Sequence, residues 1–443
     1  MATPTSGEPR TEQPPSFQEA FAYWVRLGFI NFGGPAGQIA IMHRELVDQR
    51  HWVSEALFLR ALNFAAMLPG PEAQQMAIYF GWRLHGTLGG VIAGSFFVIP
   101  SIFIMLALSY LAVVGAEIPL IAGLLYGIQT VVIAIVVEAV IRIGKRALRH
   151  PVLYTFAAAA FVALYFFNLP FPVVVIGAGL LGALFHVRWP APFQPQGHGA
   201  SQEGSVDTTP VAAPPPPLMH LLKTGLVFLV LWVVPVGLLL MWVGKDSVLV
   251  HEALFFTQVA FVTLGGAYAV LSYISNTAVN TFGWLDAHQM VQGLGLAEST
   301  PGPLIMVTQY VGFLGAWRLH GDLDPLLSGV LGALVTTYVT FLPCFMFVFA
   351  GAPYFEALAE NRSLQASLTA VTAAIVGVIL NLAVFFGLKV LFPEGRPFDL
   401  YALVVAIASY LALWRLHTPV YVLVPAGAVL GMLWTLVRPA VGL

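Results

Sequence analysis

The chain carries an internal duplication in which the matching residues are mostly glycine and proline within apolar sequence. The pentapeptide Trp-Arg-Leu-His-Gly occurs at Trp82–Gly86 and at Trp317–Gly321, and a Pro-Gly-Pro tripeptide precedes each copy. Further upstream, a Gly-Gly pair occurs at matching positions, Gly33–Gly34 and Gly265–Gly266. The duplication therefore predicts two copies of one fold whose helices break at fixed points, a combination typical of ion sites in membrane transporters.

Only 9% of the 443 residues are charged, and 58% are hydrophobic. A soluble domain carries about 25% charged residues, so this chain cannot cover a surface exposed to water. We therefore predict an all-α polytopic membrane protein surrounded by the lipid bilayer. The net charge of −2 gives no indication of a nucleic-acid partner. The single cysteine, Cys344, excludes an internal disulfide or a cysteine metal cluster, and we expect no cofactor.

Nine apolar stretches are long enough, or nearly so, to cross a bilayer as a helix of about 20 residues. They run over 88–114, 118–141, 152–168, 171–187, 218–243, 325–350, 364–390, 398–415 and 418–437. Two more segments, 19–41 and 252–275, are interrupted by the Gly-Gly pairs.

Four arms of about 14 residues are too short to cross alone. They meet in pairs at Pro-Gly-Pro, 54–68 with 71–84 and 286–298 with 304–317. Each pair is either a re-entrant hairpin or one broken helix. Non-helical backbone at this depth survives only when it is buried in protein or lines a polar cavity.

The composition divides the chain into a polar N-terminal tail (1–17), a first repeat (18–187), a proline-rich linker (188–217) and a second repeat (218–443). The tail does not resemble a signal peptide, so we expect the first apolar segment to stay as a membrane anchor. The run Arg142–His150 contains four Lys or Arg residues and no acid. The positive-inside rule places this run in the cytoplasm, and the linker, two crossings later, with it.

The orientation of the second repeat depends on how many crossings separate positions 19 and 252. Six segments have the composition of full crossings, and the first Pro-Gly-Pro element lies among them. If that element is re-entrant, this count makes the two copies parallel. If it crosses, the total is seven and the copies are inverted. The residues alone leave both arrangements open.

The Pro-Gly-Pro elements are our first candidate for a binding site. Pro69 and Pro301 end the first arm, because proline disfavours helix in the residue before it. Pro71 and Pro303 suit the first position of the following helix. The resulting helix N-terminus, with free amides and about half a positive charge, is a site for an anion. A tight turn without function is the alternative.

The Gly-Gly elements are the second candidate. Two adjacent glycines let a membrane helix unwind, or let another helix approach closely, and both interpretations stay open. For three other glycine pairs with a spacing of four residues we predict helix packing alone: Gly90/Gly94, Gly123/Gly127 and Gly427/Gly431.

Several charged and capping residues lie at the ends of the predicted helices. Glu72 has no acidic counterpart in the second copy, and we predict that it handles a proton or the substrate. We expect Ser54 and Asp286 to be N-caps of the first arms, and Glu138 with Arg142 to form a local helix pair. The chain has no zinc-protease, nucleophile-elbow or Walker motif, so we expect no enzyme, and any pumping must use an ion gradient or the membrane potential.

The segments Phe32–Pro35 (Phe-Gly-Gly-Pro) and Leu68–Gln75 (Leu-Pro-Gly-Pro-Glu-Ala-Gln-Gln) resemble the chromate ion transporter family, in its long two-domain form. The resemblance covers the chain except the N-terminal tail and the linker. The second copy departs from the pattern, with Leu264 in place of phenylalanine, Ala267 in place of proline and Leu304 in place of the acid.

The resemblance implies a multi-pass protein of the bacterial inner (plasma) membrane that exports chromate from the cytoplasm, giving chromate resistance, with sulfate as a competing oxyanion. It also implies inverted halves, which favours the count of seven crossings. The predicted substrate-binding residues are Asn31, Gly33, Gly34, Pro35, Pro69, Gly70, Pro71, Glu72, Gln74, Gln75, Gly265, Gly266, Thr300, Pro301, Gly302 and Pro303. Transport of sulfate or another small anion, a passive anion channel, a membrane scaffold and a homodimer stay open.

Overall fold

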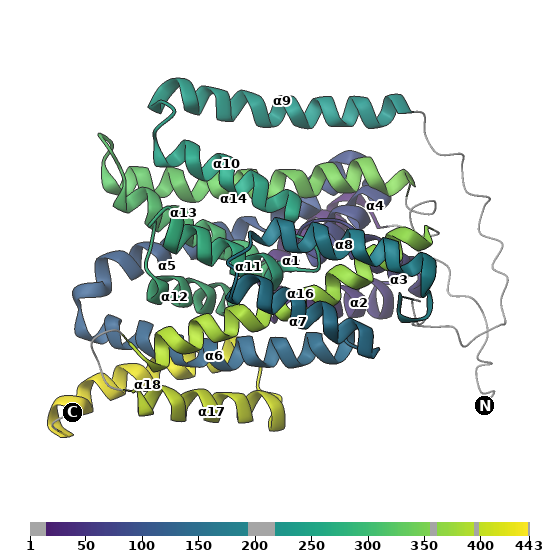
Figure 1. The fold of residues 1–443 in the computed structure, drawn as a ribbon. Coiled ribbons are helices and arrows are strands. Elements are labelled where there is room, and N and C mark those ends of the chain that lie inside the picture. The colour runs from purple at the N-terminus through teal and green to yellow at the C-terminus, as the bar shows by residue number, and fades with distance from the viewer. Residues whose placement is uncertain (1–14, 194–217, 355–360, 394–397, 442–443) are drawn as a thin grey trace, which may run out of the picture.

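Figure 1 shows the computed structural model, which describes residues 15–193, 218–354, 361–393 and 398–441. These residues form helices joined by turns, with no strand among them. Seven helical segments in this part of the chain are long and apolar enough to cross a membrane. The prediction of an all-α polytopic protein is therefore confirmed. Most of the predicted N-terminal tail and linker lies outside the described residues.

The first two described helices form a hairpin, although segment 19–41 was counted among the full crossings. Helix α1 (Phe17–Ile30) leads to the Gly33–Gly34 pair, and α2 (Gly34–His43) runs back beside it. The contacts show the return, because the guanidinium of Arg50, beyond α2, lies over the ring of Tyr23 in α1, 5.2 Å from its centroid. The Gly-Gly pair is the tip of a re-entrant hairpin.

The Pro-Gly-Pro element forms a second re-entrant hairpin, between α3 (Glu55–Ala65) and the first part of α4 (Glu72–Phe96). The ring of Phe58 in α3 stacks on that of Phe80 in α4, with centroids 5.4 Å apart. Helix α4 then reverses at His85–Gly86, where its backbone leaves helical geometry. The Trp-Arg-Leu-His-Gly pentapeptide is thus the outer end of the returning arm.

Five passes follow within the first repeat and after it, one of them, α7, only 15 residues long. The second part of α4 with α5 (Ile99–Val114) makes the first pass. The other four are α6 (Pro119–Ala147), α7 (Pro151–Tyr165), α8 (Phe171–Arg188) and α9 (Leu218–Val243). Helix α9 lies along one edge of the molecule (Figure 1), and most of its surface is exposed.

The second repeat contains the same elements in the same order. They are α10 (Val248–Val262), α11 (Ala267–Asn276), α12 (Ala287–Ser299), α13 (Val307–Arg318), α14 (Pro325–Gly351), α16 (Arg362–Leu391), α17 (Leu400–Arg415) and α18 (Val420–Val441). A π-helical turn follows α2 at Arg44–Gln49, and another follows α11 at Thr277–Thr281. A rare element at matching positions supports a shared fold for the two copies.

The second repeat also forms two re-entrant hairpins. The imidazole of His251 in α10 stacks on the ring of Phe282, beyond α11, with centroids 6.1 Å apart. The ring of Tyr310 in α13 lies against Gly293 in α12. Both hairpins therefore return to the face from which they entered.

The two repeats are inverted, as predicted, but by a different count of crossings. We call the end of the molecule with Arg142–His150 the basic face. Helix α1 begins at this face, and five passes separate it from α10, so α10 begins at the opposite face. Accordingly, the ring of Trp317, at the end of α13, lies beside the ring of Tyr110, at the end of α5, with centroids 6.0 Å apart. Both counts were wrong, the favoured seven as well as six, because segment 19–41 turns back at its Gly-Gly pair and the first Pro-Gly-Pro element is re-entrant.

Several local predictions are confirmed. The side chains of Ser54 and Asp286 accept hydrogen bonds from the third residue of α3 and α12 respectively. The small residues of α6 and α18 form a close helix crossing, with Gly127 against Gly427 and Gly123 against Gly431. A side chain on any of these glycines would collide with the facing helix and push the two backbones apart. The packing interpretation therefore holds for them.

Candidate anion site at the hairpin tips

The four hairpin tips meet crosswise inside the protein. The amide of Gly70, in the first Pro-Gly-Pro, donates a hydrogen bond of 2.8 Å to the carbonyl oxygen of Thr263. The amide of Gly302, in the second, donates one of 3.3 Å to the carbonyl oxygen of Asn31. Gly70 corresponds to Gly302 and Asn31 to Thr263 in the duplication, so each repeat gives the other the same bond. The Pro-Gly-Pro tip of one repeat thus pairs with the Gly-Gly tip of the other.

The carbonyl ends of the broken helices are occupied by donors. Gln38 Nε2 donates to the carbonyl oxygens of Asn31, at 2.9 Å, and Gly302, at 2.6 Å. Gln75 Nε2 donates to the carbonyl oxygen of Pro69 at 2.6 Å. The hydroxyl of Ser101 donates to the carbonyl oxygen of Pro301. These bonds neutralise the partial negative charge that the ends of α1, α3 and α12 bring to the centre.

The helix starts at the same tips lack such partners. Helix α2 follows Gly33, α4 follows Pro71, α11 follows Gly266, and a short 3-10 turn leading into α13 follows Pro303. None of these four starts has a side-chain cap. Five of the helices that start at a face of the protein have a side-chain cap, from Ser16, Ser54, Asp286, Asp324 and Asp399, whereas α6, α8 and α10 start at a face without one. Four uncapped N-termini, with their partial positive charge, therefore point toward the middle of the molecule.

The Gly-Gly pairs unwind the chain at these tips. Gly33, Gly34, Gly265 and Gly266 all have positive φ, between 65° and 93°. A Cβ atom on Gly33, Gly34 or Gly266 would meet little or no neighbouring backbone from another helix. Unwinding accounts for both pairs, because their backbone conformation requires glycine, and Gly265 is in addition closely packed, since a Cβ atom there would collide with Ile375 Cδ1.

Buried polar side chains surround the tips. Asn31 Nδ2 donates to the carbonyl oxygen of Phe97 at 3.1 Å, and Gln74 Nε2 to that of Gly94 at 3.2 Å. Each is less than 1% exposed. Four buried oxygens have no hydrogen-bond partner among the described residues, those of the side chains of Asn31, Gln74, Gln75 and Thr308. Buried polar atoms normally have a partner, so these atoms point to a ligand or water at the tips.

All sixteen predicted residues lie on the four tips or in the first turn after them. The tips themselves are joined by the crosswise bonds described above. Pro35 stands in the first turn of α2. Thr300 is used locally, since its hydroxyl donates to the carbonyl oxygen of Ala297 at 3.1 Å. The binding role of these residues stays a prediction.

Two acidic side chains reach this region, one from each repeat. Glu72 is the first residue of α4, is partly exposed, and makes no hydrogen bond or ion pair with a described residue. Glu298 in α12 is buried and accepts a hydrogen bond from the hydroxyl of Tyr268 in α11. Glu298 was not among the predicted residues, although an acid three residues before Pro301 within an apolar arm was a usable signal.

A line of charge on α6 lies near both acids. Arg142 Nε lies 3.2 Å from Glu138 Oε2, which confirms the predicted helix pair. Arg142 and Glu138 also lie close enough for their charges to act on Glu298, and Arg146 acts on Glu72.

The fold and the site together define a membrane protein of inverted repeats whose half-helices meet inside the protein, an arrangement found in transporters. Residues 18–183 and 251–432 match the family described as Chromate transporter. The chain belongs to the chromate transporter family, as the sequence motifs indicated. The second match begins after α9, the helix that lies between the two repeats.

Named relatives cover most of the chain. A "Chromate transport protein" of Pseudomonas aeruginosa is 32% identical over 373 residues, which are 83% of this chain and 80% of the relative. A "Probable chromate transport protein" of Synechococcus elongatus is 27% identical and covers 93% of this chain and 94% of its own length. A "Chromate transport protein" of Cupriavidus metallidurans is 26% identical, and the alignment covers 97% of this chain and 95% of the relative. No solved structure shows significant similarity to the chain.

Proposed function

We propose that this protein is a secondary active transporter of a tetrahedral oxyanion, and that it exports chromate from the bacterial cytoplasm across the inner membrane, giving chromate resistance. The relatives named above support chromate as the substrate. The structural observation that supports the proposal most is the contrast at the tips, where carbonyl ends have donors and four helix N-termini have no cap.

That contrast favours an anion over a cation. Transporters that bind Na⁺ use free carbonyl oxygens at unwound helices, while anionic groups bind at half-helix N-termini. Here the side chains of Gln38, Gln75 and Ser101 already occupy the carbonyl oxygens. A dianion accepts several N–H bonds and is stabilised by the partial charges of the helix starts, whereas the same partial charges repel a cation.

Glu72 is the residue that we assign to proton or substrate handling. Its carboxyl group stands at a helix start within the anion site and has no partner among the described residues. An ionised Glu72 would repel a dianion at short range, and a neutral one would not. The charge on this side chain can therefore link anion binding to a proton, which is the coupling that we propose.

Sulfate is the second candidate substrate. Backbone amides recognise the oxygens of a tetrahedral anion, and both chromate and sulfate present four of them. Nothing at the tips separates the two by charge or geometry, so we expect sulfate to compete for the site.

The proposal is tested by chromate accumulation in cells that express the chain, with and without added sulfate. We expect expressing cells to hold less chromate than empty cells, and sulfate to weaken the difference. The variant Pro69→Ala/Pro71→Ala should accumulate chromate like empty cells. The matched control, Pro119→Ala/Pro151→Ala, changes two prolines in the first turns of α6 and α7, far from the tips, and should behave like the wild type.

Two results would overturn parts of the proposal separately. Equal accumulation in expressing and empty cells, with the protein present in the membrane, removes chromate export. Normal export by the Pro69→Ala/Pro71→Ala variant removes the site assignment and leaves export standing.

A further inference from the structure

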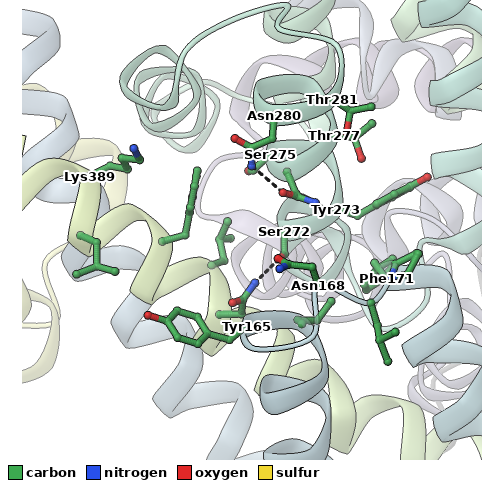
Figure 2. Close-up of a pocket in the computed structure, with 18 residues that line it drawn as sticks. Tyr165, Asn168, Phe171, Ser272, Tyr273, Ser275, Thr277, Asn280, Thr281 and Lys389 are labelled. Atoms are coloured by element: carbon green, nitrogen blue, oxygen red, sulfur yellow. Dashed lines mark hydrogen bonds between the residues drawn. The ribbon is translucent and has the colours of Figure 1, made fainter. Parts of the chain in front are cut away.

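Two cavities lie near the opposite face, and only one of them is lined by acids and histidines. The first, of about 510 Å³, lies between α11, α16 and the connection of α7 to α8. Figure 2 shows its polar groups, among them Ser275, Thr277 and Asn280, and its lining contains no acid or histidine. The second, of about 590 Å³, lies at the start of α10 and the end of α13, and two aspartates and two histidines line it. Groups that exchange protons with water near neutral pH therefore gather at the second cavity.

The side chain of Glu252, in α10, lies next to this second cavity and is 0% exposed. Its carboxyl group lies between α13 and α14, because a Cβ atom on Gly315 would be 2.7 Å from Oε1 and one on Gly332 would be 2.8 Å from Oε2. The side chain of Trp284 also lies against Gly315, and it lines the cavity. The carboxyl group is therefore just behind the wall of the cavity.

Neither oxygen of Glu252 has a hydrogen-bond partner among the described residues. Burying an ionised carboxylate without a partner is strongly unfavourable, whereas burying the neutral acid is far less so. A metal ion would need several oxygen ligands, and no group of three acids, histidines or cysteines in the described part of the chain could hold one. A proton is thus the cation that fits a single buried carboxyl group.

The other charged and titratable groups around α10 leave this carboxyl group alone in its site. At the opposite face stand Lys245 and Asp246 before α10, Arg318 and Asp324 at the ends of the helices beside it, and His251, His320 and Asp322 of the cavity. All of these except His320 are exposed. The helices packed on α10 add the tyrosines Tyr268, Tyr273, Tyr310 and Tyr338. The exposed groups can exchange protons with water and supply them to the cavity.

A row of buried side chains connects this carboxyl group with the hairpin tips along α14. Gly332, beside the carboxyl group, is followed at intervals of four residues by Thr336, Thr340 and Cys344. Residues four apart lie on one face of a helix, so the row extends over about 18 Å. It ends at the first Pro-Gly-Pro tip, since a Cβ atom on Gly70 would lie 3.0 Å from Cys344 Sγ. The hydroxyl of Thr340 has no partner among the described residues, so it can bind a water molecule between the two ends.

The duplication shows that this acid belongs to one repeat. Glu252 stands 13 residues before Gly265, and the residue 13 positions before Gly33 is Ala20, which is also buried. An acid inside an apolar helix is costly and generally serves a function. Each repeat therefore brings a different acid to the inside of the protein, Glu72 from the first repeat and Glu252 from the second.

We propose that Glu252 binds the coupled proton on its way between the opposite face and the hairpin tips, with the row on α14 as its route. The inference rests on the proposed coupling of anion transport to a proton, and it places a second acid in series with Glu72. The proton comes from water in the cavity, forms an O–H bond with one oxygen of Glu252 and leaves toward the tips. Because the two acids act in series, the loss of either one removes the response to pH.

The test measures chromate accumulation in proteoliposomes of known orientation while the pH is changed at the opposite face alone. In the wild type, one coupled proton should change the accumulation ratio about tenfold for each pH unit. In Glu252→Gln, which keeps the size of the side chain, the change should fall below about twofold. Exchange of labelled for unlabelled chromate at equal pH moves no net proton, so this variant should keep it.

Two matched variants separate the titrating group from a structural role. Glu252→Asp keeps a carboxyl group and should keep a response to pH. Glu117→Gln removes an exposed acid at the same face, outside the cavity, and should respond like the wild type. A tenfold response in Glu252→Gln overturns the inference. Loss of chromate exchange in both Glu252→Gln and Glu252→Asp shows a structural role only and overturns it as well.

The wild type tests the proposed function in the same experiment. Uptake that saturates and responds to pH supports coupled transport before any variant is compared, so a failure of Glu252 is not confused with a failure of transport. Saturable uptake without a response to pH overturns the coupling and this inference with it, and leaves anion transport standing.

Discussion

Gly70 and Gly302 each place one backbone N–H against a carbonyl oxygen of the other repeat, and both adopt positive φ, 121° and 110°. Residues with a side chain rarely adopt this backbone conformation. The space is also filled, because a Cβ atom on Gly70 would lie 2.8 Å from Gln75 Nε2, and one on Gly302 would collide with Ser101 Oγ. Glycine is therefore required at both positions for two reasons, the backbone conformation and the close packing.

The first prediction concerns Gly302→Ala. The added methyl group displaces the hydroxyl of Ser101 and strains the backbone, so we expect a loss of about 1–3 kcal/mol of folding free energy. Thermal unfolding in detergent measures the loss. Gly237→Ala is the control, since Gly237 lies in α9 with open space around it. A Tm for Gly302→Ala equal to that of the control would contradict the crosswise contact.

The second prediction concerns Glu72→Gln. The change keeps the size of the side chain and removes its ability to gain or lose charge. We expect chromate transport to lose its dependence on pH, with a rate that stays flat across the range in which the wild type varies. Initial rates in vesicles between pH 5 and pH 8 measure this. Glu117→Gln, at an exposed position of the opposite face, should keep the wild-type profile. A wild-type profile and rate in Glu72→Gln would exclude the assigned role.

At the scale of elements, the sequence predicted that helices break, and largely where. The prolines marked the Pro-Gly-Pro tips, and the capping residues Ser54 and Asp286 marked the starts of the arms. The direction of the chain after each break could not be predicted, because proline and glycine end a helix without fixing where the next one points. The partner of each tip could not be predicted either. The bonds of Gly70 and Gly302 join residues far apart in the chain, and no local pattern encodes them.

The third prediction concerns the reversal inside α4. Gly86 has φ 63° and ψ −160°, a region open almost only to glycine. Space is not limiting there, since a Cβ atom on Gly86 would meet no neighbour within 4 Å. We expect Gly86→Ala to cost about 1–3 kcal/mol through backbone strain alone. Gly177→Ala, in the middle of α8 and equally uncrowded, should cost nothing, and Tm values in detergent compare the two. Equal Tm values would mean that α4 does not reverse at Gly86.

At the scale of the whole molecule, the two repeats have the same fold, but their hairpins pack differently against the long helices. Helix α11 packs on α16, while the corresponding helices of the first repeat, α2 and α6, are not packed together to that extent. The hairpins of the first repeat also form a hydrophobic cluster of their own, apart from the main core.

The fourth prediction tests the inverted arrangement. Thr87 and Asp322 occupy matching places, one residue after the glycine of each Trp-Arg-Leu-His-Gly, and both are exposed. In vesicles of known orientation, a thiol reagent that cannot cross the membrane should label Thr87→Cys from the basic face and Asp322→Cys from the opposite face. The native Cys344 is buried, so the unaltered protein serves as the blank. Labelling of both variants from the same face would contradict the inversion.

The central claim is that an oxyanion passes the crosswise hairpin tips by coupled transport. Chromate uptake by the purified protein in proteoliposomes, measured with radiolabelled chromate against increasing chromate concentration, tests it most directly. We predict uptake that saturates, is inhibited by sulfate, responds to an imposed pH gradient and is lost in Pro69→Ala/Pro71→Ala. Uptake that rises linearly with concentration, ignores the pH gradient or persists in that variant would contradict the account.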